Sequence, residues 1–205
     1  MQNTIEFSIK TNTLKALLLF SAKKDIRHYL NGVFFESCEN GINSVATDGH
    51  ALIAIRESID NQYTGLSAII PRESLERAVK TKSVSLIITT DNERFNIADG
   101  GNVISGTCDD GRFPDYRRVI PSTCNNEPAT YSAELLLNFE KANKLLTGVS
   151  RPKVLQNGTD GAQVKFTGTS NAIGVIMPMR DTENFSAYTP SWISESVTKA
   201  LEIAA

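Results

Sequence analysis

The proline-containing segment 109–121 constrains the fold of this chain more than any other feature. It combines two prolines, two aromatic residues and three arginines in thirteen positions. Pro114 and Pro121 fix φ and remove two backbone donors, so the segment suits neither a helix nor a central strand. Phe113 and Tyr116 supply large apolar surfaces with which it can dock. We therefore expect a stiff, basic connector between two folded parts of the chain.

The composition is that of an ordinary globular protein. The 205 residues suffice for one large domain or two small ones, and 40% of them are hydrophobic. No apolar run reaches the length of about 18 residues that a transmembrane helix needs. Residues 1–10 lack the apolar core of a signal peptide. Cys38, Cys108 and Cys124 are widely spaced and form no Cys-x-x-Cys motif, so we expect free thiols and a cytoplasmic protein without a membrane partner.

Hydrophobic periodicity predicts an α+β fold over the first 121 residues, with helices packed on antiparallel sheets. Two copies of a strand-helix-strands unit follow one another, each about 60 residues long. The first copy is expected to contain strands at 6–9, 32–37 and within 42–55, a turn at 39–41, and a helix capped by Thr13 with Leu14, Leu17 and Leu18 on its apolar face. The second copy is expected to contain strands at 68–70, 84–88, 95–97 and 103–108, and a helix at 73–80 that Pro71 opens.

After the connector the same pattern is present once more. We expect a helix at 133–146, capped by Ser132 with Leu135, Phe139 and Ala142 inward, and strands at 153–155, 162–167 and 172–177. A further helix is expected to begin at Thr189-Pro190, with Ile193, Val197, Ala200 and Leu201 on one face. These patterns divide the chain into a domain at 1–121, a half domain at 122–180 and a C-terminal helical extension at 181–205.

Three groups of residues, in this order along the chain, resemble one bacterial protein family. They are 27–33 together with 45–52, the connector, and the run Val-Ile-Met-Pro-Met-Arg at 175–180. Together they resemble the replicative sliding clamp, the beta subunit of DNA polymerase III. The resemblance implies a DNA-clamp-like fold in which 1–121 corresponds to the middle domain and 122–180 to half of the last domain. The first domain of the family has no counterpart here.

The resemblance also implies a hydrophobic pocket between the middle and last domains that captures short linear motifs. Aliphatic, proline and methionine side chains suit such a pocket because they can receive Leu or Phe side chains. Its wall would be formed by Leu30, Thr47, Gly49, His50, Leu52, Pro114, Arg118, Val119, Val175, Ile176, Met177, Pro178 and Met179, with Arg180 at the edge. Alternatively, Leu30, Leu52 and Val175 simply belong to an inter-domain core. Ala51 departs from the basic residue that is usual in the family, and the C-terminal helix could shield the pocket.

A second candidate site is a basic cluster expected at the end of the first helix, formed by Lys23, Lys24, Arg27, His28 and Tyr29. Lysine and arginine bind phosphates, and tyrosine can stack on a base. The resemblance implies that Lys24, His28 and Tyr29 match clamp positions that touch DNA. Alternatively, these cations only oppose the helix dipole. The net charge of -2 is compatible with a basic inner face on an otherwise acidic ring.

Catalytic, metal and cofactor sites are not indicated by the sequence. His28 and His50 are the two histidines, and they form no His-x-x-x-His motif. The segment 48–50 is typical of a turn rather than a catalytic base. Asp109 and Asp110 precede a glycine, as in a solvated turn, and no phosphate-binding Gly-rich loop is present. We therefore predict neither an enzyme nor a cofactor.

These observations lead to a sliding-clamp-like replication accessory, a processivity factor, as the first hypothesis. It would bind duplex DNA non-specifically as a self-associated homo-oligomeric ring and tether DNA polymerase or repair proteins, with a clamp loader as a further candidate partner. Because the first-domain counterpart is absent, the ring would need a new closing surface, for which the C-terminal helix is a candidate. The alternative is a non-ring adaptor or decoy that binds clamp-interacting proteins or the host clamp.

Overall fold

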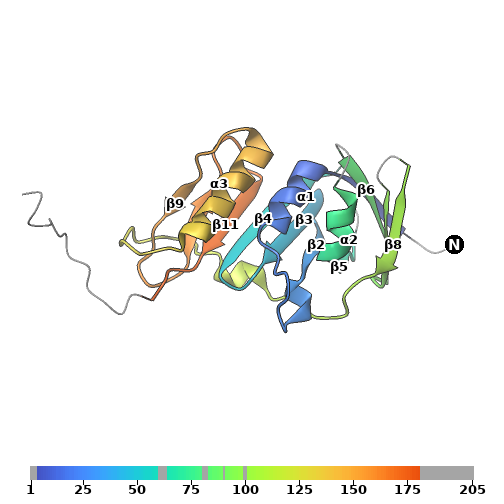
Figure 1. Ribbon diagram of the computed structural model, residues 1–205, viewed down its shortest axis with the longest axis horizontal. Coiled ribbons are helices and arrows are strands. Elements are labelled where there is room, and N and C mark those ends of the chain that lie inside the picture. The colour runs from blue at the N-terminus through green and yellow to red at the C-terminus, as the bar shows by residue number, and fades with distance from the viewer. Residues whose placement is uncertain (1–3, 60–63, 80–82, 90, 99–100, 181–205) are drawn as a thin grey trace, which may run out of the picture.

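The computed structural model describes residues 4–59, 64–79, 83–89, 91–98 and 101–180 (Figure 1). The C-terminal helix expected from Thr189-Pro190 lies outside these residues. The first part of the chain contains β1 (Thr4–Lys10), α1 (Thr11–Leu18), the 3-10 turn η1 (His28–Leu30), β2 (Gly32–Cys38), β3 (Gly41–Thr47), β4 (Ala51–Ser58), β5 (Ser67–Pro71), α2 (Arg72–Ala78), β6 (Ser83–Thr89), β7 (Arg94–Ala98) and β8 (Val103–Thr107). After these come the 3-10 turn η2 (Tyr116–Val119), α3 (Ala133–Thr147), β9 (Lys153–Leu155), β10 (Ala162–Lys165) and β11 (Ala172–Ile176).

The predicted α+β class is confirmed, and so is the repeated plan of strand, helix and three strands. The two copies are β1-α1-β2-β3-β4 and β5-α2-β6-β7-β8. Each copy gives its first strand to the sheet of the other, since β1 pairs with β6 and β5 pairs with β2, both antiparallel. The result is one sheet in the order β1-β6-β7-β8 and a second that begins β5-β2-β3-β4. Because of this exchange, neither copy has a complete sheet without the other.

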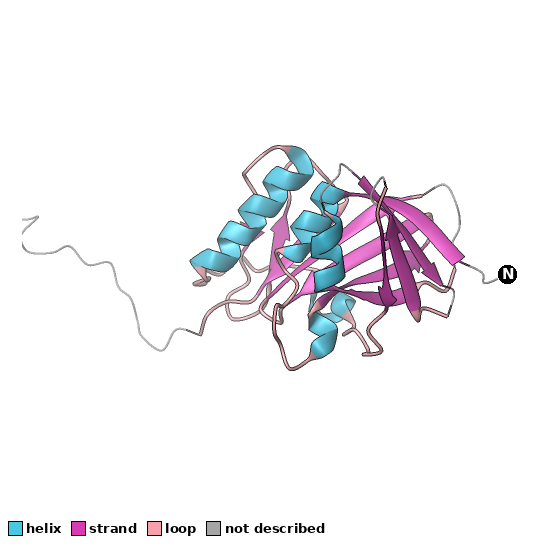
Figure 2. Cartoon of the chain, turned by 45° about the vertical axis from the view of Figure 1, so that its right-hand side comes forward, coloured by secondary structure: helices cyan, strands magenta, loops and turns pink. Residues whose placement is uncertain are grey.

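A third group of elements, which we call the α3 unit, consists of α3, β9, β10 and β11. Strand β11 pairs antiparallel with β4, so the second sheet continues to seven strands in the order β5-β2-β3-β4-β11-β10-β9. Helix α3 packs beside α1, where the rings of Phe20 and Phe139 lie 4.6 Å apart. The three helices lie on one side of the seven-stranded sheet, as the two views show (Figures 1 and 2). The predicted division at residue 121 is thus spanned by a continuous sheet, and the domain boundary itself stays a prediction.

Each face of the seven-stranded sheet carries an apolar cluster, since successive side chains of a strand point to opposite faces. Phe35 and Ile53 belong to the larger core, which also contains the apolar faces of α1 and α3 and the four-stranded sheet. Their neighbours Phe34 and Leu52 belong to a smaller apolar cluster on the opposite face. In the described residues no helix is long and apolar enough to cross a membrane.

One predicted helix cap is wrong, and the other is confirmed in its position alone. Helix α1 begins at Thr11, so Thr13 lies inside it, buried, and its hydroxyl donates to Glu57 Oε1 at 2.9 Å. Ser132 does stand at the N-cap of α3, as predicted, but its side chain makes no capping bond there. Tertiary contacts explain the first difference, because Glu57 on β4 offers Thr13 an acceptor that the local sequence does not reveal.

Candidate functional site

The connector lies on the outer face of the seven-stranded sheet, the face that is turned away from α1 and α3. The ring of Phe113 stacks on Phe34 of β2, with centroids 4.8 Å apart and planes inclined by 6°. Tyr116 is buried beside it, in the cluster that also includes Leu52 and Val175. The aromatic side chains therefore dock as the sequence predicted, and they close a small second core.

Glu36 on β2 holds the connector through polar contacts. Tyr116 donates its hydroxyl hydrogen to Glu36 Oε1 at 2.5 Å, and Asn43 Nδ2 donates to the same oxygen at 3.0 Å. Arg117 forms an ion pair with the same carboxylate, and its guanidinium lies 4.6 Å from the centre of the Tyr116 ring. These contacts join residues about 80 positions apart in the sequence and fix the turn η2.

The protonation equilibria of this cluster favour the ion pair. Burial alone would raise the pKa of Glu36, but the hydrogen bonds from Arg117, Tyr116 and Asn43 outweigh it and lower the pKa. Burial, together with the hydrogen bond to Glu36, raises the pKa of Tyr116. At neutral pH Glu36 is therefore the charged acceptor and Tyr116 is a neutral donor.

A mainly apolar pocket of about 160 Å³ opens between the connector, η1, the β3–β4 turn and β11. Leu30, Leu52 and Val175 line it and are themselves buried, whereas Val119 and Met177 are exposed. The complete lining is Arg27, Tyr29, Leu30, Thr47, Gly49, His50, Ala51, Leu52, Phe113, Pro114, Asp115, Tyr116, Val119, Val175 and Met177. The pocket thus has buried aliphatic walls and an accessible mouth, as sites for apolar side chains do.

The β3–β4 turn that forms one wall is shaped by short-range hydrogen bonds. The backbone N–H groups of His50 and Ala51 both donate to Asp48 Oδ1 at 2.8 Å, and Gly49 N–H donates to Thr47 Oγ1 at 3.0 Å. Gly49 has φ of +92°, a left-handed conformation that glycine adopts without strain. Asp48 therefore serves as a turn-forming acceptor, in agreement with the reading of 48–50 as a turn.

The structure brings nine of the fourteen residues predicted for the peptide pocket together around this one cavity. They are Leu30, Thr47, Gly49, His50, Leu52, Pro114, Val119, Val175 and Met177. The alternative reading of Leu30, Leu52 and Val175 as core residues describes their burial but omits the cavity that they line. Whether the pocket binds a peptide stays a prediction.

Ile176 is not part of the pocket wall, which corrects the prediction for this residue. Its side chain is fully buried in the larger core, because it points to the face of β11 opposite to that of Val175. Arg118 is exposed on η2 and does not line the pocket. Pro178, Met179 and Arg180 line a second, larger groove of about 1260 Å³, and His50 and Met177 line both hollows.

Six pocket-lining residues were absent from the predicted peptide site. They are Arg27, Tyr29, Ala51, Phe113, Asp115 and Tyr116. The sequence did carry a signal for two of them, because Phe113 and Tyr116 had already been identified as the docking aromatics of the connector. Arg27 and Tyr29 had been assigned to the DNA-contacting cluster, and only their position beside the connector shows that they also face the pocket.

The five residues predicted to contact DNA do not lie at the end of a helix. Helix α1 ends at Leu18, and Lys23 and Lys24 follow in an exposed loop, so the alternative of cations opposing a helix dipole does not apply. Lys23 and Lys24 line the larger groove. Arg27 instead forms a two-point ion pair with Asp25, with its Nη2 2.8 Å from Oδ2, and this contact lowers the pKa of Asp25 to about 2.

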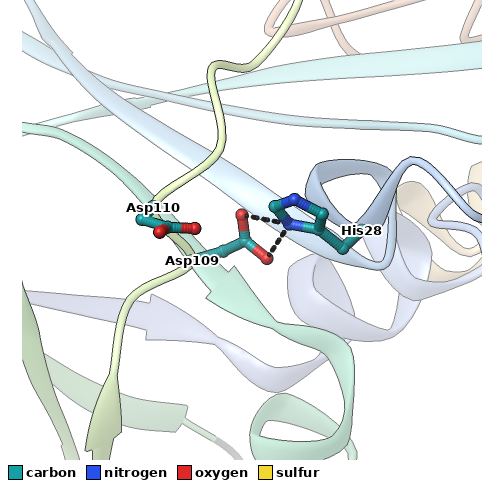
Figure 3. Close-up of side chains that lie close together, drawn as sticks. All are labelled: His28, Asp109 and Asp110. Carbon is teal, nitrogen blue, oxygen red and sulfur yellow. Dashed lines mark hydrogen bonds and ion pairs between the residues drawn. The ribbon is translucent and has the colours of Figure 1, made fainter.

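His28 of the same cluster is held by the start of the connector (Figure 3). Its Nδ1 lies 2.9 Å from Asp109 Oδ2, and the hydrogen bond to Asp109 raises the pKa of the imidazole. With the neighbouring carboxylate of Asp110, these residues offer three potential ligand atoms within 4.8 Å of one another. The ion pair ties η1, one wall of the pocket, to the segment that leads into Phe113.

The three cysteines are free thiols. Cys108 stands at the start of the connector, where burial raises the pKa of its thiol to about 11. A thiol with so high a pKa is a poor nucleophile at neutral pH, because the thiolate is the reactive form.

Comparison with known proteins identifies the family. Residues 5–115, more than half of the chain, match the family model described as DNA polymerase III beta subunit, central domain. The chain belongs to the DNA polymerase III beta subunit family. Among the curated members of this family, it is 35% identical to the beta sliding clamp of Proteus mirabilis over 158 residues, which cover 68% of this chain and 42% of that protein. It is 34% identical to the beta sliding clamp of Escherichia coli K12 over 198 residues, covering 84% of this chain and 54% of that protein.

Solved beta subunit structures share the fold. The DNA polymerase III subunit beta of Pseudomonas aeruginosa matches with a TM-score of 0.69 at 19% identity, over 88% of this chain and 67% of that one. The beta subunit of Thermotoga maritima also matches with a TM-score of 0.69, at 17% identity, over 87% and 66%. The chain spans about a third to just over half of the curated beta subunits that it matches.

Proposed function

We propose that this beta subunit family member is a non-enzymatic tether that holds DNA polymerase or repair proteins through short linear motifs bound in the apolar pocket. The observation that carries the proposal is the pocket itself. It combines buried aliphatic walls with an open, apolar mouth, and it lies where β11 joins the sheet at β4. A pocket of this size admits one or two apolar side chains of a peptide, which suits a motif with Leu or Phe anchors.

Three features support a peptide as the occupant. The larger groove shares His50 and Met177 with the pocket, so an extended chain that leaves the pocket finds an adjoining surface. Met177 and Met179 are exposed there, and methionine adapts its shape to different apolar guests. A solved clamp from Caulobacter crescentus is described as having PEG bound to a putative beta-motif tethering region, so a site of this kind is suggested in a structural neighbour.

Binding of a fluorescent Leu- and Phe-containing clamp-binding peptide, followed by fluorescence anisotropy, tests this proposal. We expect Val119→Asp to weaken binding by about tenfold or more, because a desolvated carboxylate is costly in an apolar mouth. Val103→Asp is the matched control, since Val103 is 65% exposed on β8, outside the pocket, and Val119 is 50% exposed. An affinity that is unmeasurable for the unmodified chain, or equal in both variants, overturns the proposal.

We further propose that the helix-bearing side contacts duplex DNA through exposed lysines such as Lys23 and Lys24. Neither residue has an ion-pair partner among the described residues, so both charges are available to phosphates. Lys24→Glu should weaken DNA binding and reduce its dependence on salt, because each lost phosphate contact reduces the slope by about one. Lys165→Glu is the control: Lys165 is exposed on β10, where alternation directs it away from the side of Val164 and α3.

In this function the chain would raise the local concentration of its partner at DNA rather than catalyse a reaction. Encircling DNA would require self-association, with duplex DNA in the resulting ring and a clamp loader as a further candidate partner. Titration of a labelled duplex tests the DNA component separately from the peptide component, because the lysines and the pocket mouth are changed by different substitutions.

A second candidate function is a non-ring adaptor or decoy that captures clamp-binding motifs, or docks on the host clamp, without binding DNA. One observation favours it: Arg27 and His28 are already engaged by Asp25 and Asp109, so fewer cations than predicted are free for phosphates. Motif-peptide affinity together with no measurable binding of the labelled duplex would select this function over the tether.

A further inference from the structure

The α3 unit lacks the partner that both other copies of the repeat possess. In those copies, the first strand after the helix is flanked by a strand from the opposite copy: β5 covers β2, and β1 covers β6. The corresponding strand after α3 is β9, which pairs with β10 on one side. On its other side β9 is the last strand of the sheet, so among the described residues its outer edge has no strand beside it.

The segment that precedes α3 does not pair with the outer edge of β9. It occupies the place in the repeat that β1 has before α1 and that β5 has before α2. Its backbone hydrogen bonds join it to residues outside β9: Asn126 N–H donates to Gln156 O at 3.0 Å, Gly158 N–H donates to Glu127 O at 3.0 Å, and Met179 N–H donates to Thr130 O at 2.8 Å. The opposite end of the sheet differs, since Asp109 N–H donates to Ile69 O at 2.9 Å and so covers the edge of β5.

An apolar groove of about 620 Å³ lies between α3 and β9, on the same side of the unit as this bare edge. Its lining is Ala133, Leu136, Leu137, Phe139, Glu140, Ser150, Arg151, Pro152 and Val154. Leu137 is 45% exposed although it is a large aliphatic residue on a helix that otherwise turns its apolar face inward. An edge strand beside an apolar hollow is a surface suited to association.

We propose that a second copy of this chain covers the surface, so that two α3 units associate about a two-fold axis and complete one another. The first two copies of the repeat show that units of this kind complete each other within one chain. The groove contains one acidic and one basic residue, Glu140 and Arg151. When the grooves of two chains face each other about a two-fold axis, each of these residues can therefore meet its opposite charge on the other chain. The chain also already extends one sheet through a strand edge, at the β4–β11 joint.

This inference goes beyond the proposed function and does not depend on peptide binding, because a single two-fold contact joins two copies without closing a ring around DNA. The partner chain supplies a strand for the edge of β9 and apolar side chains for the groove. Antiparallel addition at a strand edge satisfies backbone donors and acceptors of both copies at once.

Light scattering after size-exclusion chromatography of the full chain, over a roughly hundredfold concentration range, tests the proposal. We expect an even-numbered multimer of the 22.4 kDa chain. Leu137→Glu should raise the dissociation constant at least about tenfold, because it buries an unpaired carboxylate. Ile26→Glu is the matched control, since Ile26 is 98% exposed and lies outside the groove. A monomer at every concentration overturns the proposal.

Two further measurements keep the result decisive. Arg151→Glu changes an exposed side chain of the same groove, and it replaces Leu137→Glu if circular dichroism shows that the latter is unfolded. A multimer that neither substitution weakens places the contact elsewhere and overturns the inference. Motif-peptide anisotropy on the same samples separates the two proposals. A Leu137→Glu variant that dissociates but binds the peptide with unchanged affinity supports the inference. An unmodified chain that is multimeric but does not bind the peptide contradicts only the proposed function.

Discussion

The two faces of the seven-stranded sheet each carry an apolar cluster, but they are covered in different ways. The inner face packs on α1, α3 and the four-stranded sheet through large apolar side chains such as Phe35, Ile53 and Phe139. Among the described residues, the connector and η1 cover part of the outer face, and its cluster is smaller. There Glu36, which Tyr116 and Arg117 share, is one polar anchor of the connector, and the pair of His28 and Asp109 is another.

The difference separates the residues that stabilise the fold from those that form the candidate site. A continuous apolar core contributes most of the free energy of folding, because burial of apolar surface is the dominant favourable contribution. The pocket is open on the outer face, where Phe113 and Tyr116 are positioned by few contacts. We therefore expect substitutions on the inner face to unfold the protein, and substitutions at the anchor to alter the pocket while most of the fold persists.

The largest effect is expected on the inner face, from Phe139→Ala. Phe139 is fully buried, its ring lies 4.6 Å from that of Phe20 and 6.1 Å from that of Phe166, and it joins α3 to α1. Loss of the ring should lower the free energy of unfolding by about 3–5 kcal/mol, as measured by urea denaturation. Lys144→Ala, an exposed change on the same helix, should stay within about 0.5 kcal/mol. Equal effects of the two substitutions would contradict the role given to this core.

A smaller effect is expected on the outer face, from Tyr116→Phe. This change removes the hydroxyl that donates to Glu36 while keeping the buried ring. The free energy of unfolding should fall by about 1 kcal/mol, and the connector should exchange its amide hydrogens faster than α1 does. Tyr29→Phe provides the control, since the Tyr29 hydroxyl makes no hydrogen bond within the described part of the chain. Uniformly faster exchange over the whole fold would show that the two faces are not separable.

The most selective test uses pH. Because the folded pKa of Glu36 lies below its ordinary value of 4.5, its contribution to stability is fully present above that value and is lost as the pH falls through the folded pKa. We expect Glu36→Gln to flatten this part of the stability profile between about pH 7 and about pH 3 in thermal unfolding. Parallel profiles for the unmodified chain and the variant would mean that the charge of Glu36 does not contribute to the stability of the outer face.

Local patterns predicted most of the elements. The alternation of Val84, Leu86 and Ile88 is that of a strand with one buried face, and the structure has β6 there with these three residues buried. Pro71 was expected to open a helix, and α2 begins at the next residue. The turn at 39–41 contains Asn40 with φ of +58°, a conformation that asparagine tolerates well. Such features follow from a few neighbouring residues, and for that reason they can be predicted.

The polar contacts of the site could not be predicted in the same way. Glu36 and Tyr116 are far apart in the sequence, and nothing in either local pattern indicates that they meet. Asp25 lies next to the cations of the DNA-contacting cluster, but its ion pair with Arg27 depends on the course of the loop after α1. Such contacts depend on how distant segments pack, so several predicted roles became specific only in the folded chain.

The sequence by itself determined the order of strands and helices, the docking aromatics of the connector and the resemblance to the sliding clamp family, because periodicity, turn residues and motifs are properties of adjacent residues. The tertiary structure decided which strands pair, including the exchange of β1 and β5 and the joint between β4 and β11. It also decided that Val175 lines the pocket while Ile176 is buried in the core. The physical reason is that pairing partners and strand faces are selected by burial against segments far away in the chain, which no local pattern specifies.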